Sequence, residues 1–288
     1  EAELAEAYER IAAAPTWLTR WEGSRRDLAR LKNLTSSLIG RFAHEGCWPC
    51  KAVAGKPVVF YMGDDSRNEY IYKFVSKALW DAADVGKGHT AGAKYMSEGT
   101  LYVAKFNADG SGTWVELTHG KNGLDAANAI YPFADQADVL VHARLAGDAV
   151  GATKMDRPEW VSVHPRTGEV YVTLTNNSGR KTVDDANPRE KNVYGQIVRW
   201  REAGGDAAAT TFEWDIFVLA GNPTVHTDRK DLRSGSANIT ADNTFNSPDG
   251  LAFDRDGRLW IQTDGKYSNK GDYAGQGNNQ MLCASPET

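Results

Sequence analysis

Two periodicities divide the chain. Residues 2–33 carry apolar side chains every three to four positions with charged side chains between them, which predicts helices. From about residue 41 onward, short runs rich in β-branched and aromatic residues predominate, and such runs predict strands. We therefore predict a helical N-terminal segment over residues 1–39 and a mainly β domain over residues 40–288.

The predicted strands fall into groups separated by long connections. The groups are PVVFYMG, EYIYKFVS, GTLYVAKFN and TWVELT, then EWVSVHP, EVYVTLT, GQIVRWRE and FEWDIFVLA, then GLAFDRDG, RLWIQTD and NNQMLCAS. An amphipathic stretch, ADQADVLVHARLAGDAVG, predicts helix between the first two groups. Four-stranded antiparallel groups are typical of β-propeller blades. We predict a β-propeller with helical insertions and an incomplete set of blades, part of a longer propeller domain; a β-sandwich with helical decoration is the alternative.

One segment of the chain occurs more than once. Residues 155–177 align with residues 247–264, with Pro158 on Pro248 and Glu159 on Asp249, 90 positions later. A looser third copy spans residues 41–65 and has Glu45 near its start. Such repetition indicates one structural unit used several times. In a propeller the innermost strands line the central channel, so we expect the three acids to converge on one axial site.

The residues around these acids suggest a chemistry. Carboxylates from separate loops suit Ca²⁺ or another hard cation, and Asp264 adds a fourth candidate ligand to Glu45, Glu159 and Asp249. Arg157 and Lys266 can grip an anion, and so can the amides of Asn278 and Asn279. The simpler interpretation is that the acids cap turns and the cations form local ion pairs. Metals and basic residues acting on one oxyanion indicate phosphoester hydrolysis.

Composition excludes several classes of protein. The net charge of −5 argues against nucleic acid as a partner. The sequence contains no apolar run of about 18 residues, so we predict no membrane span. It also lacks the H-E-x-x-H, G-x-S-x-G, Walker and G-x-G-x-x-G patterns.

Cys47 and Cys50 form a C-x-x-C motif, CWPC. Its surroundings resemble a loop between strands, whereas a redox motif needs a helix N-terminus. A zinc knuckle would need a second pair, which Cys283 alone cannot supply. A local disulfide or two inert thiols is the favoured interpretation.

Several longer segments resemble the PhoX-type alkaline phosphatases. They are GRFAHEG, YMGDDSRNEYIYKFVS, EGTLYVAKF, GATKMDRPEWVSVHPRTGEVYVTLTNN, NPREKNVYGQIVRW and SPDGLAFDRDGRLWIQTDGK with GNNQM. They occur in the family's order over about residues 40–285. The resemblance implies a monomeric periplasmic or secreted phosphatase, exported by the twin-arginine route, that acts on phosphomonoesters. It also implies a propeller with an iron–calcium cofactor, Fe³⁺ and Ca²⁺.

The resemblance also implies roles for individual residues. Glutamates such as Glu45 and Glu159 are metal ligands in the family, while Asp249 and Asp264 are placed at the metals. Residues such as Arg157, Lys266 and Asn279 hold the phosphate. The family's iron ligands include a cysteine from a segment ahead of this chain, so that role is not transferred to Cys47 or Cys50.

Two other functions compete with phosphatase activity. SPDGLAFDRDGRLWI also resembles calcium-dependent lactonase-like propeller hydrolases, although Lys266 and the Arg157-Pro158-Glu159 stretch fit them poorly. A non-catalytic propeller that binds a partner is the third possibility, and it predicts an aromatic rather than a charged channel mouth.

Overall fold

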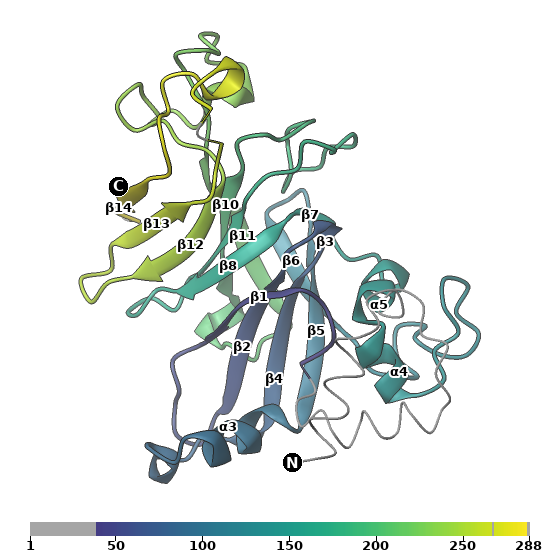
Figure 1. The fold of residues 1–288 in the computed structure, drawn as a ribbon. Coiled ribbons are helices and arrows are strands. Elements are labelled where there is room, and N and C mark those ends of the chain that lie inside the picture. Colours follow the sequence, from purple (N-terminus) through teal and green to yellow (C-terminus); the bar gives the residue numbers. More distant parts are fainter. Residues whose placement is uncertain (1–38, 267, 287–288) are drawn as a thin grey trace, which may run out of the picture.

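The structure is a computed structural model that describes residues 39–266 and 268–286. The helices expected over residues 2–33 lie outside the described residues. The described part is mainly β, as the sequence predicts, with short helices between strands (Figure 1).

Nine strands form one antiparallel sheet whose order is β1-β2-β4-β5-β6-β11-β10-β9-β8. The strands are β1 (His44–Pro49), β2 (Pro57–Asp64), β4 (Ile71–Leu79), β5 (Gly99–Phe106), β6 (Ser111–Glu116), β8 (Pro158–Val163), β9 (Val170–Leu174), β10 (Gln196–Glu202) and β11 (Thr211–Leu219). The two predicted groups of strands are both present. They join where β6 pairs with the start of β11, from Thr211 opposite Thr113 to Glu213 opposite Ser111.

A second sheet contains the third predicted group. It consists of β12 (Pro248–Phe253), β13 (Leu259–Thr263) and β14 (Met281–Ala284). β8 lies against both β1 and β12, so the first strands of the three groups are neighbours in space (Figure 1). A short ribbon of β3 (Arg67–Glu69) and β7 (Met155–Asp156) links the connections beside them.

The CWPC motif corrects one expectation. Cys47 lies within β1 rather than in a loop, because the residues around it pair with β2 from His44 opposite Asp64 to Pro49 opposite Phe60. Both Cys47 and Cys50 are free thiols. The absence of a disulfide agrees with the interpretation of two inert thiols.

The connection between the first two groups forms two short helices instead of one. These are α4 (Gln136–Val141) and α5 (Ala143–Ala149), and the chain bends between them at His142, where φ is −106° and ψ is 41°. Their apolar residues pack with Tyr72 and Leu101 of the sheet and with Tyr70, which precedes β4. An earlier connection holds a third helix, α3 (His89–Met96).

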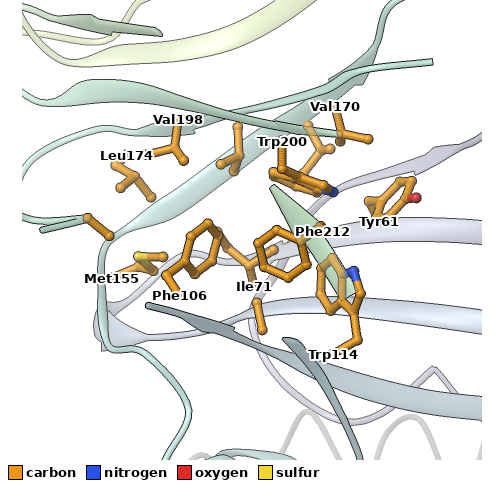
Figure 2. Close-up of a cluster of buried hydrophobic side chains, with 14 of the residues drawn as sticks. Tyr61, Ile71, Phe106, Trp114, Met155, Val170, Leu174, Val198, Trp200 and Phe212 are labelled. Carbon is orange, nitrogen blue, oxygen red and sulfur yellow. The ribbon is translucent and has the colours of Figure 1, made fainter. Parts of the chain in front are cut away.

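The main core lies between the two halves of the nine-stranded sheet. Figure 2 shows its aromatic side chains, among them Tyr61, Phe106, Trp114, Trp200 and Phe212. The rings of Trp114 and Trp200 meet edge to face with centroids 5.8 Å apart, a favoured aromatic geometry. This packing holds β2 and β8 side by side and so determines where their ends meet.

A buried ion pair lies at the edge of this core. The Glu202 carboxylate accepts hydrogen bonds from the Tyr61 hydroxyl at 2.8 Å and from the Trp114 indole at 3.0 Å. It also accepts from the Lys73 ammonium at 3.2 Å and the Trp200 indole at 3.2 Å. Donors from β2, β4 and β6 thus converge on one side chain of β10, and every charge in the group has a partner.

Candidate functional site

Three copies of one backbone unit meet where the neighbouring first strands begin. In each copy, the backbone amide that follows the second strand donates a hydrogen bond to a backbone carbonyl near the start of the first strand. That carbonyl lies two residues before the acid of the first strand. The bonds run from Asp65 to Ala43 at 2.9 Å, from Thr175 to Arg157 at 3.1 Å, and from Asp264 to Ser247 at 3.0 Å. We call residues 43–45 with Asp65 the first repeat unit, residues 157–159 with Thr175 the second, and residues 247–249 with Asp264 the third.

Each of the three acids lies at an irregularity of its strand. The pairing register shifts just after Glu45 in β1, across Glu159 in β8 and across Asp249 in β12. Bulges of this kind redirect a side chain locally and are common beside functional sites. The three copies inferred from the sequence are therefore structurally equivalent, and the acids occupy the same place in each.

The second and third repeat units share a strained backbone. Arg157 has φ of 56° and Ser247 has φ of 51°, and each directly precedes a proline. Side chains rarely adopt this left-handed region, and a following proline normally favours an extended conformation. Strain that recurs at equivalent positions indicates that the surrounding structure enforces it, as is common at binding sites.

Small residues allow the first two units to approach closely. A Cβ atom on Gly63 would lie 2.4 Å from the Pro158 carbonyl oxygen and 2.5 Å from that of Glu159. Gly63 is also the residue opposite Glu45 in the β1–β2 pairing. Its missing side chain lets β2 pass close to the backbone of Pro158 and Glu159.

The acids of the second and third units are in direct contact. Glu159 is 3% exposed and hydrogen-bonds with Asp249. Burial raises the pKa of Glu159 and the contact with Asp249 raises it further, while Thr175 and Arg157 lower it. The Thr175 hydroxyl donates to the Pro248 carbonyl at 2.8 Å and also contacts Glu159. Two carboxylates in contact are a place where a cation could bind.

The first unit adds further negative charge. Burial raises the pKa of Glu45, and the nearby carboxylates of Asp249 and Asp65 raise it further. Burial likewise raises the pKa of Asp249, to which Asp264 and Asp65 contribute. Acids from all three repeat units therefore feel one another's charge.

Arg157 is the cation among these acids. Its Nε lies 2.9 Å from Asp65 Oδ1, and its Nη2 donates to Asp65 Oδ2 at 3.0 Å. Nη2 is also 2.7 Å from Glu159 Oε1. The guanidinium thus bridges the first and second units, and 28% of the side chain remains exposed to meet a ligand.

Lys266 and Asn279 lie beside the third unit. The Lys266 amide donates to Asn246 Oδ1 at 3.1 Å, and the Gly265 amide donates to Asn279 Oδ1 at 2.8 Å. The Lys266 side chain is exposed. Within the described part of the chain, no ion pair joins the Lys266 ammonium to the acids. The structure thus brings Arg157 to the acid cluster and places Lys266 and Asn279 on a loop at its edge.

Sequence reasoning missed two members of the cluster. Asp65 and Thr175 occupy the same position in their units as Asp264 does in the third. The signal was present, because the strand ends YMGDD, VTLT and IQTD align when the repeat is extended to its second strand. The sequence GDDSRNEY instead suggested only a loop between strands.

The cluster fits a hard cation by its donor type. Carboxylate oxygens from several segments are the ligands that Ca²⁺ and other hard cations take. In the described residues, no three His, Cys, Asp or Glu side chains are already arranged as a metal site. The contact between Glu159 and Asp249, with Asp65 and Asp264 near Asp249, nevertheless gathers more carboxylates than the single cation Arg157 balances.

The helices of the described residues include none that is long and apolar enough to cross a membrane.

Comparison with known proteins places these features in context. A protein-family model described as "Alkaline phosphatase PhoX" matches residues 27–288. Among solved structures, the chain is similar to Pseudomonas fluorescens PhoX in complex with vanadate, a transition state analogue, with 54% sequence identity and a TM-score of 0.79. The match covers 87% of this chain and 44% of that one, so the chain spans less than half the length of its relative. The search of curated proteins finds no match.

Proposed function

The chain belongs to the PhoX alkaline phosphatase family, and from this membership we propose that it forms part of a metal-dependent phosphatase. The substrates are phosphomonoesters, from which inorganic phosphate is released. Because the chain corresponds to 44% of the relative's length, the activity belongs to the full-length protein.

The observation that supports this proposal most is the meeting of three acids and one arginine from three repeat units. Burial raises the pKa values of Glu45, Glu159 and Asp249 and neighbouring carboxylates raise them further, while Arg157 is the cation that bridges two of the units. A protein keeps such a costly arrangement where a ligand of opposite charge completes it. Cations bound to the acids together with Arg157 form a site for a phosphoryl group.

We assign the cation site to Glu45, Glu159, Asp249 and Asp264, and the geometry adds Asp65 to this set. The cations are Ca²⁺ and Fe³⁺, both hard ions that take oxygen donors. When bound, they neutralise charge on the phosphoryl oxygens and lower the pKa of a bound water. Cys47 has no part in the set, because burial raises the pKa of its thiol to about 11 and so disfavours the thiolate that binds a metal.

Arg157, Lys266 and Asn279 bind and orient the phosphate. The planar guanidinium of Arg157 presents two donors to two phosphoryl oxygens, and its contact with Asp65 limits its orientation. Lys266 acts as a point charge from the edge of the site. The Asn279 side chain anchors the Gly265 amide through its carbonyl oxygen, which leaves its NH₂ group for the anion.

A substrate panel tests the proposal. Full-length protein is assayed with p-nitrophenyl phosphate and with a small lactone, each with calcium and with a chelator. We expect calcium-dependent hydrolysis of the phosphoester alone. Hydrolysis of the lactone alone would favour the lactonase-like alternative, and no turnover of either would favour a binding module.

The remaining proposals come from the family resemblance. The protein is a periplasmic or secreted monomer that scavenges phosphate and has no nucleic-acid partner. Fractionation of the native host and a native molar mass measurement test location and oligomeric state.

A further inference from the structure

The first repeat unit differs from the other two in sequence. The second and third units have a proline between the left-handed residue and the acid, Pro158 and Pro248, whereas the first has His44. Proline restricts φ and so limits how far the following acid can move. Ala43 does not share the left-handed backbone of Arg157 and Ser247. The backbone before Glu45 therefore lacks the restraint that the other two acids have.

A buried carboxylate provides a different restraint in the first unit. Asp64, at the end of β2, is 0% exposed, and its Oδ1 accepts the Ala43 amide at 3.1 Å. The residues at the matching positions of the other units are Leu174 and Thr263, which carry no charge. Asp64 thus holds the backbone just before Glu45 and directly precedes Asp65 in the chain.

Arg144 of α5 supplies the countercharge that lets Asp64 be buried. Its Nε donates to Asp64 Oδ2 at 2.8 Å, and its Nη2 donates to Asp64 Oδ1. An ionised carboxylate away from water requires such a partner. The helical insertion between the first two groups of strands therefore reaches the candidate site through one side chain.

We propose that Arg144 is a positioning residue, which fixes Glu45 and Asp65 through Asp64 and thereby sets the cation affinity of the site. The inference rests on the proposed function. Without Arg144, the Asp64 carboxylate loses its countercharge and turns toward water. The Ala43 amide then has a poorer acceptor, and the two ligands of the first unit lose their alignment. Removing partners that orient metal ligands typically lowers affinity by about 10–100-fold.

The test compares Arg144→Gln with a matched variant of another two-pronged pair. Arg199 bonds Asp215 through Nε at 2.7 Å and Nη2 at 2.9 Å, on β10 and β11. Its exposed fraction of 30% is close to the 39% of Arg144. In full-length protein, Arg144→Gln should need about tenfold more calcium for half of the thermal stabilisation. Arg199→Gln should respond to calcium as the wild type does.

A second readout does not depend on metal or turnover. In calcium-free protein, Arg144→Gln should speed amide hydrogen exchange in peptides covering Ala43 and Asp65, while peptides covering Thr175 and Asp264 stay at wild-type rates. Asp64→Asn keeps an acceptor for the Ala43 amide without the buried charge, so the double variant Asp64→Asn/Arg144→Gln should regain part of the protection.

The outcomes separate the inference from the proposed function. Two results would overturn the positioning role. One is that Arg144→Gln changes hydrogen exchange equally in all three units, and the other is that Arg144→Gln and Arg199→Gln respond equally to calcium. A wild type that ignores calcium and p-nitrophenyl phosphate would overturn the proposed function, and hydrogen exchange would still decide whether Arg144 restrains the first unit.

Discussion

Among the described residues, the charged side chains around Glu202 and those around Glu159 are built on opposite principles. At the edge of the core, Glu202 receives four donors, one of which is the Lys73 ammonium, so its carboxylate has a countercharge. At the start of β1, β8 and β12, five acids face a single arginine, and two of the acids are in contact. A compensated cluster holds the protein together, whereas an uncompensated one is suited to a ligand.

The largest effect is expected in the compensated cluster. Lys73→Met leaves the Glu202 carboxylate buried without its cation, which should lower the free energy of unfolding by about 3–5 kcal/mol. Denaturant unfolding measures the loss. The double variant Lys73→Met/Glu202→Gln should recover a large part of it, because no buried charge remains. A loss below about 1 kcal/mol for Lys73→Met would show that the pair contributes little.

In the uncompensated cluster the expected loss is of activity. Arg157→Lys keeps the charge but loses the two-pronged geometry, so kcat/KM should fall by about 10²-fold in full-length protein. The melting temperature and calcium content should stay near those of the wild type. Arg258→Lys, which alters an ion pair of the β12–β13 turn, serves as the control.

Lys266→Met extends the test to the edge of the site. Turnover should fall, and inorganic phosphate should inhibit the variant less than the wild type, because the product uses the same donors. Unchanged phosphate inhibition would remove Lys266 from the phosphate site.

The same chemical change should have different consequences in the two clusters. In calcium-free protein, Glu202→Gln should lower the melting temperature, because Lys73 loses its countercharge. Glu159→Gln should lower it less, since the charge that it removes is buried beside Asp249, and both burial and Asp249 raise the pKa of Glu159. With calcium added, Glu159→Gln should blunt the rise in melting temperature that the wild type shows. A full calcium response in Glu159→Gln would exclude Glu159 as a ligand.

A smaller effect is expected at Glu69, which has both carboxylates and cations as neighbours. Burial raises its pKa to about 7, with Asp64 and Asp148 raising it and Arg144 and Lys154 lowering it. The folded protein therefore binds this proton more tightly than the unfolded chain does. Stability due to Glu69 is complete below pH 4.5 and is lost as the pH rises to about 7.

Glu69→Gln removes this dependence. Relative to wild type, the variant should gain at most about 2 kcal/mol between these pH values, a figure reduced because 21% of the side chain is exposed. Melting curves across pH measure the difference. A difference that does not change with pH would show that Glu69 titrates normally.

Much of the fold follows from local sequence patterns. Alternation and β-branched runs located the strands of the three groups, and the repeated Pro-Glu and Pro-Asp steps indicated which acids would be equivalent. Other features depend on partners far along the chain. The sequence around Cys47 contains glycine, cysteine and proline and suggested a loop, but pairing with β2 makes it a strand. The expected single helix breaks at His142, where α4 and α5 follow the surface of the sheet.

The sequence by itself determined which segments are copies of one unit, because periodicity and repetition can be recognised from the order of residues along the chain. It therefore pointed to Glu45, Glu159 and Asp249 as a set. Only the tertiary structure decided how the set is completed. Asp65 joins Arg157 from 92 positions away, and Arg144 reaches Asp64 from 80 positions away. Charges act through space. The packing of β1, β8 and β12 therefore decides which carboxylate has a countercharge and which is left for a ligand.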